Sequence, residues 1–187
     1  LKFLKMQINP HFLFNALNNI YALTVTNSEK TQESISTLSE MLRYVIYDCE
    51  QAKVPLYKEL NYIENYIELF KLKSSKSFNI KLTKNIMNES ILVAPMLFLP
   101  YIENAFKYGI NPDEDSEIII DVQAKEKGIA LHVSNRIVVD KALLPEISEE
   151  GHKNTRKRLD HLYPSKYDLS IDEVGEMYRV KLYIELL

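Results

Sequence analysis

The spacing of apolar residues changes once along the chain, and this change limits the folds that the chain can adopt. Before Ser74, apolar residues recur at the three- and four-residue steps of amphipathic helices. From Phe78 onwards, stretches such as 78–82 and 117–124 alternate apolar and polar residues, as strands do. The order predicts an α+β fold in which helices precede a mixed sheet that carries helices on one face.

The first 50 residues read as a helical hairpin. One stripe of the first helix consists of Phe14, Leu17, Tyr21 and Val25, beside a second set that includes Phe12. A polar turn at 26–29 leads to a second helix, whose predicted apolar face is Ile35, Leu38, Met41/Leu42 and Val45/Ile46. One hairpin leaves apolar stripes uncovered, so we expect two copies to pair as a homodimeric four-helix bundle.

A connector at 50–53 separates this hairpin from the remainder of the chain. A third helix is predicted to start at 54–56 and to bury Leu60, Ile63, Tyr66/Ile67 and Phe70. We therefore expect two domains, a dimerisation domain at 1–50 and a second domain at 54–187.

The second domain is predicted to be a two-layer α/β sandwich. A helix at 96–108 ends at Gly109, and a polar, irregular stretch is expected at 135–151 before a basic helix at 154–163. The expected strands are 78–82, 117–124, 128–133, 168–172 and 178–186.

Composition excludes several classes of function. The net charge of −3 gives no reason to expect nucleic acid as a partner. The single cysteine, Cys49, excludes an internal disulfide framework. No apolar run reaches the length of a membrane span. Because the chain opens inside a helical pattern, we expect it to be part of a longer protein whose membrane anchor or sensor lies upstream.

His11 is a candidate for chemistry near the start of the first helix. Pro10 suits a first helical turn because it has no N–H to donate. A single histidine on an amphipathic helix is more often a surface or interface residue, and spacing alone leaves both interpretations open.

A second candidate site lies on the helix that Gly109 ends. Asn104 and Lys107 are three residues apart and share a helix face. An amide oxygen suits Mg²⁺, and a lysine supplies a point charge for phosphate. The alternative is a polar helix face that simply meets water, although residues 97–102 before it are apolar on nearly all sides.

Both candidate sites fall in stretches that resemble one family. Residues 9–15, Asn-Pro-His-Phe-Leu-Phe-Asn, resemble the phospho-acceptor box of the LytS-type sensor histidine kinases, and 99–110 resemble the N box of the same kinases. Residues 54–66 resemble the segment between these boxes. The resemblance implies the Bergerat ATP-binding fold in the second domain, shared with gyrases and heat-shock chaperones.

The same resemblance assigns roles to individual residues. It implies that His11 accepts a phosphoryl group from ATP and that Asn104 binds Mg²⁺. It implies that Lys107 and Tyr108 contact the nucleotide, and that Glu103 is a proton acceptor or positions a water.

The carboxyl-terminal half departs from the family pattern. Asn135 stands where the family has an adenine-binding aspartate, and an amide oxygen can still accept from an adenine amino group. Gly151 and Asn154 match the second glycine box, but Glu149 replaces a glycine, and a carboxylate repels triphosphate. Either this lid has degenerated, or the sequence omits a few flexible lid residues near Gly151 and His152.

These observations predict a function and partners. The resemblance implies the cytoplasmic kinase core of a bacterial inner-membrane sensor, which uses Mg²⁺ and ATP to phosphorylate His11 and passes the phosphoryl group to an aspartate of a response regulator, of the LytTR type. One alternative is a dimeric signalling scaffold with a degenerate nucleotide pocket. A third class is an ATPase of the gyrase or chaperone kind without phosphohistidine.

Overall fold

The computed structural model describes residues 10–26, 28–72, 79–88, 90–111, 116–138 and 147–186. The chain divides into two compact units. The first unit comprises Leu1–Ser77 and Ser90–Met96, and the second comprises Phe78–Glu89 and Leu97–Leu187. Each unit is described by itself.

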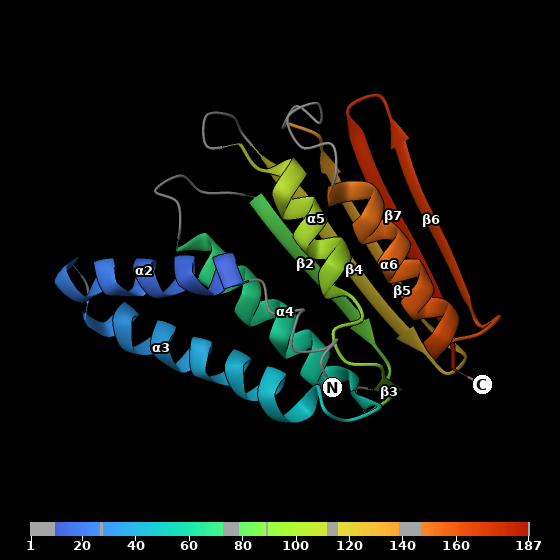
Figure 1. Ribbon diagram of the computed structural model, residues 1–187, viewed down its shortest axis with the longest axis horizontal. Coiled ribbons are helices and arrows are strands. Elements are labelled where there is room, and N and C mark those ends of the chain that lie inside the picture. Colours follow the sequence, from blue (N-terminus) through green and yellow to red (C-terminus); the bar gives the residue numbers. More distant parts are fainter. Residues whose placement is uncertain are drawn as a thin grey trace. The chain divides into compact units, whose positions relative to one another are not determined.

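The first unit contains the predicted helical hairpin. Helix α2 spans Pro10–Thr26 and α3 spans Ser28–Arg43, and Figure 1 shows the two side by side. A π-helix, η1, continues from α3 over Tyr44–Asp48. The hairpin buries mainly small and apolar side chains, namely Ala16, Ile20, Leu38 and Met41.

The two apolar stripes of α2 have different environments. Ala16 and Ile20 are buried, whereas Phe14, Leu17, Tyr21 and Val25 are 65%, 47%, 75% and 85% exposed in the single chain. The outward stripe is therefore a continuous apolar face along the helix.

The predicted buried face of α3 is partly wrong. Leu38 and Met41 are buried as expected, but Ile35 and Ile46 are exposed. Their places toward the interior are taken by Thr31, Ser34 and Thr37. The hydroxyls of Ser34 and Thr37 donate to carbonyls one turn earlier, and this satisfies them inside the helix and lets short polar side chains be buried.

The third helix, α4, spans Leu56–Lys71 and belongs to the first unit. The predicted residues Leu60, Ile63, Tyr66 and Ile67 are buried, while Phe70 is only partly so. Residues before it form a short strand, β1, over Val54–Pro55, which pairs antiparallel with β3, Leu92–Val93. The division into compact units differs from the expected boundary at 50–54, and the domain boundary stays a prediction.

The second unit is built on a five-stranded sheet with the order β2-β4-β5-β7-β6. The strands β2 and β4 pair in parallel and all other neighbours are antiparallel, so the sheet is mixed, as predicted. Helices α5, Leu99–Gly109, and α6, Ile147–Leu162, lie over one face of this sheet in Figure 1. The strands are β2 Asn79–Ile86, β4 Glu117–Lys125, β5 Gly128–Arg136, β6 Tyr167–Val174 and β7 Met177–Glu185.

Alternation along the strands produces the core of the second unit. Every second residue of the central strands is buried, because successive side chains of a strand point to opposite faces. These buried strand residues are Ile118, Ile120, Val122 and Ala124 on β4, Ile129, Leu131, Val133 and Asn135 on β5, and Tyr178, Val180, Leu182 and Ile184 on β7. Asn135 is thus a polar residue in a position that the pattern reserves for the core.

Two helix boundaries differ from the sequence prediction. Helix α5 begins at Leu99 rather than Met96, because Met96 has a φ of 55°, which is incompatible with a right-handed helix. Helix α6 begins at Ile147, inside the stretch predicted to be irregular. That stretch is rich in polar residues and contains Gly151, a poor helix former, so it carries no clear apolar period.

Candidate functional site

The helix α5 presents the candidate residues of the second unit. Pro100 occupies its first turn, where a missing N–H costs nothing. Tyr101, Ala105 and Tyr108 are buried on the side facing the core. The predicted residues Glu103, Asn104 and Lys107 are partly buried and lie at the margin of that buried face.

Asn104 is held by a tyrosine that the sequence analysis did not single out. The side chain of Asn104 shares a hydrogen bond with the hydroxyl of Tyr178 on β7, which is 2% exposed. Burial raises the pKa of Tyr178 above its usual range, and the bond with Asn104 acts in the opposite direction.

Asn135 lies beside Tyr178, its partner across β5 and β7. It also packs closely on the end of α5, because a Cβ added to Gly109 would lie 2.7 Å from the Cβ of Asn135. Asn104, Asn135 and Tyr178, which we call the amide cluster, therefore lie together where α5 meets β5 and β7. Only a glycine at position 109 permits this approach.

The carboxamide of Asn135 has one unused acceptor within the described part of the chain. Its Nδ2 donates to the carbonyl of Arg136 at 2.9 Å. Its Oδ1 is buried and has no hydrogen-bond partner among the described residues. Because a buried acceptor without a partner is costly, such an atom is a candidate ligand contact, and an exocyclic amino group of a purine fits its chemistry.

The hydroxyls of Tyr101 and Tyr108 are likewise buried without a hydrogen-bond partner among the described residues. Burial raises the pKa of Tyr101 above its usual range, and the charge of Arg156 on α6 opposes this. The backbone carbonyl of Tyr108 accepts from the N–H of Val138 at 2.9 Å, and the Nζ of Lys107 lies 5.0 Å from the Tyr108 ring centroid. Tyr101 and Tyr108 each interact electrostatically with Tyr178 of the amide cluster.

The remaining candidates belong to other elements. Gly151 and Asn154 are part of the continuous helix α6, and Asn154 is exposed. The expected glycine-rich lid is therefore helical from Ile147 onwards, while residues 139–146 lie outside the described residues. His11 is in the first turn of α2 in the first unit, and its side chain lies outside the described part of the structure.

Two properties limit the chemistry of the described residues. None of their histidine, cysteine and acidic side chains forms a group of three that could hold a metal ion. Nor does any described helix combine the length and apolar character needed to cross a membrane. A divalent ion at α5 would thus be held by a small number of protein oxygens and a phosphate, as Mg²⁺ usually is.

The sequence analysis did not identify Tyr178 as a site residue. It assigned Gly109 only the role of ending a helix. The signal for Tyr178 is weak, since a tyrosine in the inward-facing register of a strand reads as an ordinary core aromatic. Its hydroxyl gains a role only when the fold brings α5 over β7.

Known proteins resemble this chain in sequence. A model of the histidine kinase family matches residues 1–78. The sensor protein LytS of Staphylococcus saprophyticus is 31% identical over 183 residues, which cover 91% of this chain and 31% of that protein. The sensor histidine kinase/phosphatase LytS of Staphylococcus aureus is 34% identical over 173 residues, covering 87% and 29%. Over most of its length, this chain is similar to the LytS-type sensor histidine kinases.

Solved structures support the fold of this chain. A structure described as a bacterial phosphotransferase is 10% identical, covers 92% of this chain and 88% of its own, and has a TM-score of 0.52. The catalytic domain of histidine kinase ThkA is 14% identical, covers 72% and 96%, and has a TM-score of 0.51. The chain spans less than a third of the length of the LytS proteins that it matches.

Proposed function

We propose that this chain is the kinase core of a two-component sensor histidine kinase. It binds ATP with Mg²⁺ in the second unit and transfers the γ-phosphoryl group to His11. The observation that carries the proposal is the amide cluster, in a chain related to LytS over most of its length. A helix that carries Asn104 is packed against a strand end whose Asn135 holds an unused acceptor among the described residues.

Each member of the amide cluster fits one part of the nucleotide. Asn135 would accept a hydrogen bond from the adenine amino group through Oδ1. The carboxamide oxygen of Asn104 would ligate Mg²⁺, while Tyr178 fixes the orientation of that carboxamide. Lys107 would meet a phosphate as a point charge, and Tyr108, Gly151 and Asn154 would complete the nucleotide site. Bound Mg²⁺ would neutralise charge that develops on the phosphate oxygens.

The transfer needs little covalent chemistry from the protein. A neutral ring nitrogen of His11 forms a bond to the γ-phosphorus as the bond to the β-bridging oxygen breaks, and ADP leaves. An unperturbed histidine, with a pKa of about 6.5, is largely neutral at physiological pH. Glu103 would hold the proton that the imidazole releases, or a water. The phosphoryl group would then pass to an aspartate of a response regulator, of the LytTR type.

Labelling with γ-³²P-ATP tests this function. We expect label that is lost in acid and is absent in His11→Gln, with His132→Gln as the matched control because His132 is an exposed histidine on β5. Release of inorganic phosphate without labelled protein would instead indicate an ATPase. Absence of nucleotide binding would indicate the signalling scaffold, which the helical course of Glu149–Asn154 favours.

We further propose that the chain is a homodimer through the outward stripe of α2, as a cytoplasmic portion of a membrane sensor. A stripe of large apolar residues, of which Tyr21 is 75% and Val25 is 85% exposed, is the kind of face that a four-helix bundle buries. We expect Tyr21→Glu to produce monomers in sedimentation equilibrium without loss of helix content. Ala22→Glu, also exposed on α2 but displaced sideways from that stripe, is the control. A dimer unaffected by Tyr21→Glu would place the interface elsewhere.

A further inference from the structure

Glu59 is a buried carboxylate at the centre of the first unit. It lies in the first turn of α4 and is 2% exposed. A carboxylate is rarely buried unless other groups hydrogen-bond to it or carry the opposite charge, because removing it from water is costly. The groups that bind Glu59 therefore indicate what it holds in place.

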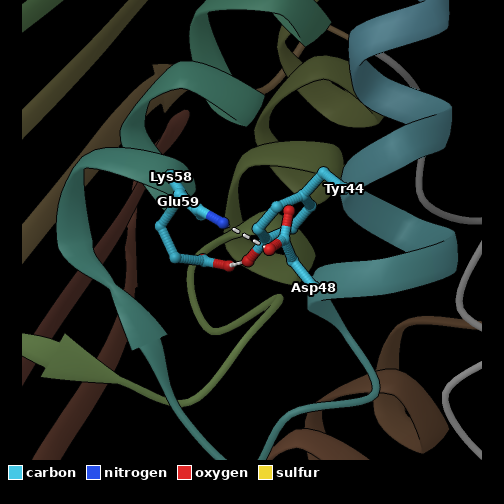
Figure 2. A network of polar contacts seen from close by, with 4 residues as sticks. All are labelled: Tyr44, Asp48, Lys58 and Glu59. Atoms are coloured by element: carbon cyan, nitrogen blue, oxygen red, sulfur yellow. Dashed lines mark hydrogen bonds and ion pairs between the residues drawn. The ribbon is translucent and has the colours of Figure 1, made fainter.

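One oxygen of Glu59 accepts hydrogen bonds from two distant segments. The hydroxyl of Tyr44 donates to Oε1, as Figure 2 shows, and the backbone N–H of Met96 donates to the same oxygen at 2.5 Å. Tyr44 is the first residue of η1, at the end of the α2–α3 hairpin. Met96 is the last residue of the first unit before the chain enters the second unit at Leu97.

Both donors sit in backbone that departs from regular structure. The segment η1 is a π-helix, a form that occurs mostly as short insertions and often at functional sites. Met96 has a φ of 55°, an unfavourable conformation for a residue with a side chain. Such backbone persists only where its surroundings hold it, and the hydrogen bond that the Met96 N–H donates to Glu59 holds Met96 directly.

Neighbouring contacts join the same elements. The N–H of Leu56 donates to the carbonyl of Ile91 at 2.7 Å, which ties the start of α4 to the segment that leads to Met96. Lys58 and Asp48 form an ion pair between α4 and η1, also drawn in Figure 2, and both are partly exposed. A hollow of about 230 Å³ beside η1 is lined by Tyr44, Asp48 and Lys58.

We propose that Glu59 is a positioning residue that couples the end of the histidine hairpin to the chain crossing at Met96. A change in η1 is transmitted through the Tyr44 hydroxyl and the Glu59 carboxylate to the backbone that enters α5. We expect this coupling to help position His11 for phosphoryl transfer, and that role rests on the proposed function. The mechanical coupling between η1 and Met96 does not rest on it.

Amide hydrogen exchange followed by NMR tests the coupling without any activity. In Tyr44→Phe the ring remains but the hydroxyl is lost, so we expect exchange of the Met96 N–H to rise at least tenfold. Glu59→Gln keeps an acceptor oxygen without its charge and should give a smaller rise. The double variant should match the larger of the two single effects, because both act through one carboxylate.

Tyr47→Phe is the matched control, since it removes a hydroxyl from an exposed residue of the same η1 segment. Met96 exchange should not change in this variant. Asp48→Asn, which weakens the exposed ion pair between the same two elements, should change Met96 exchange less than twofold. Unchanged Met96 exchange in folded Tyr44→Phe overturns the proposal.

Labelling kinetics then separate positioning from a purely structural role. We expect kcat for His11 labelling to fall about tenfold in Tyr44→Phe, with KM for ATP within twofold of wild type. If the wild type labels and Tyr44→Phe labels at the same rate, the positioning role is overturned. If the wild type does not label at all, the proposed function fails, and the exchange result alone decides the coupling.

Discussion

The two units each bury a polar cluster, and the clusters differ in how their hydrogen bonds are satisfied. In the first unit, the carboxylate of Glu59 receives the Tyr44 hydroxyl and the Met96 N–H. In the second unit, the amide cluster has a buried Asn135 oxygen that no described residue bonds. A satisfied cluster stabilises and positions the chain, whereas an unsatisfied one offers a ligand a contact that the protein itself does not use. Substitutions in the first should therefore affect stability, and substitutions in the second should affect binding.

The largest effect is expected from Asn104→Ala. Removing the carboxamide takes away the proposed Mg²⁺ ligand, so labelling of His11 should fall by about 10³-fold, in line with loss of a group that contacts developing charge. Because Asn104 is only partly buried, the thermal midpoint should change little. Initial rates with γ-³²P-ATP and a calorimetric scan measure the two quantities. Wild-type labelling by this variant would remove Asn104 from the site.

Glu59→Ala compared with Asn135→Ala tests the contrast directly. Glu59→Ala leaves two buried donors without their acceptor and should lower the free energy of unfolding by about 3 kcal/mol. Asn135→Ala removes the Oδ1 atom, which has no hydrogen-bond partner among the described residues, and the single bond from Nδ2 to the Arg136 carbonyl. It should therefore lower the free energy of unfolding by only about 1 kcal/mol. Urea titrations followed by circular dichroism compare them. An equal decrease in the free energy of unfolding for both variants would contradict the distinction between the two clusters.

Alkaline titration extends the comparison to the buried tyrosines. Burial raises the pKa of Tyr44 in the first unit, with a further rise from Glu59, and burial also raises that of Tyr101 in the second. An unfolded tyrosine has a pKa of about 10, so the folded state binds the proton more tightly. Each buried tyrosine therefore contributes to the free energy of unfolding, and this contribution is fully present below pH about 10. Above that pH it is lost at about 1.4 kcal/mol per pH unit for each tyrosine.

Absorbance at 295 nm should show these tyrosines ionising only as the protein unfolds. Tyr101→Phe removes a hydroxyl that has no hydrogen-bond partner among the described residues. The variant should therefore have the free energy of unfolding of the wild type at pH 7, and above pH about 10 this free energy should fall less steeply than in the wild type. Ionisation of all tyrosines before unfolding would contradict the burial argument.

The smallest effect is expected from Tyr178→Phe. The ring still fills the core, but the amide of Asn104 loses the hydroxyl that orients it. We expect the Mg²⁺ concentration for half-maximal labelling to rise about fivefold, as is common for groups that orient a metal ligand. Tyr183→Phe on the same strand, where the side chain is 44% exposed, is the control. An unchanged Mg²⁺ requirement would leave Tyr178 as a core residue only.

Local pattern was enough to predict most of the fold. The sequence pattern predicted strands at 117–124 and 128–133, which became β4 and β5, and the helical period predicted α2, α3 and α4. The start of α6 was wrong because Ile147–Gly151 has no apolar period, and Ile35 was wrongly placed inside because period alone does not say which stripe meets a neighbour. Of the candidate site, Asn104 and Asn135 were predicted one at a time, each from its own stretch of sequence.

The sequence by itself determined the order of the elements and the identity of the groups capable of chemistry, because these depend on residues close together along the chain. Only the tertiary structure decided which of those groups meet. It placed Asn104 on Tyr178 and Asn135 against Gly109, and it joined Tyr44 and Met96 through Glu59. Contacts between residues far apart in the sequence follow from strand register and helix packing, and no local pattern encodes these.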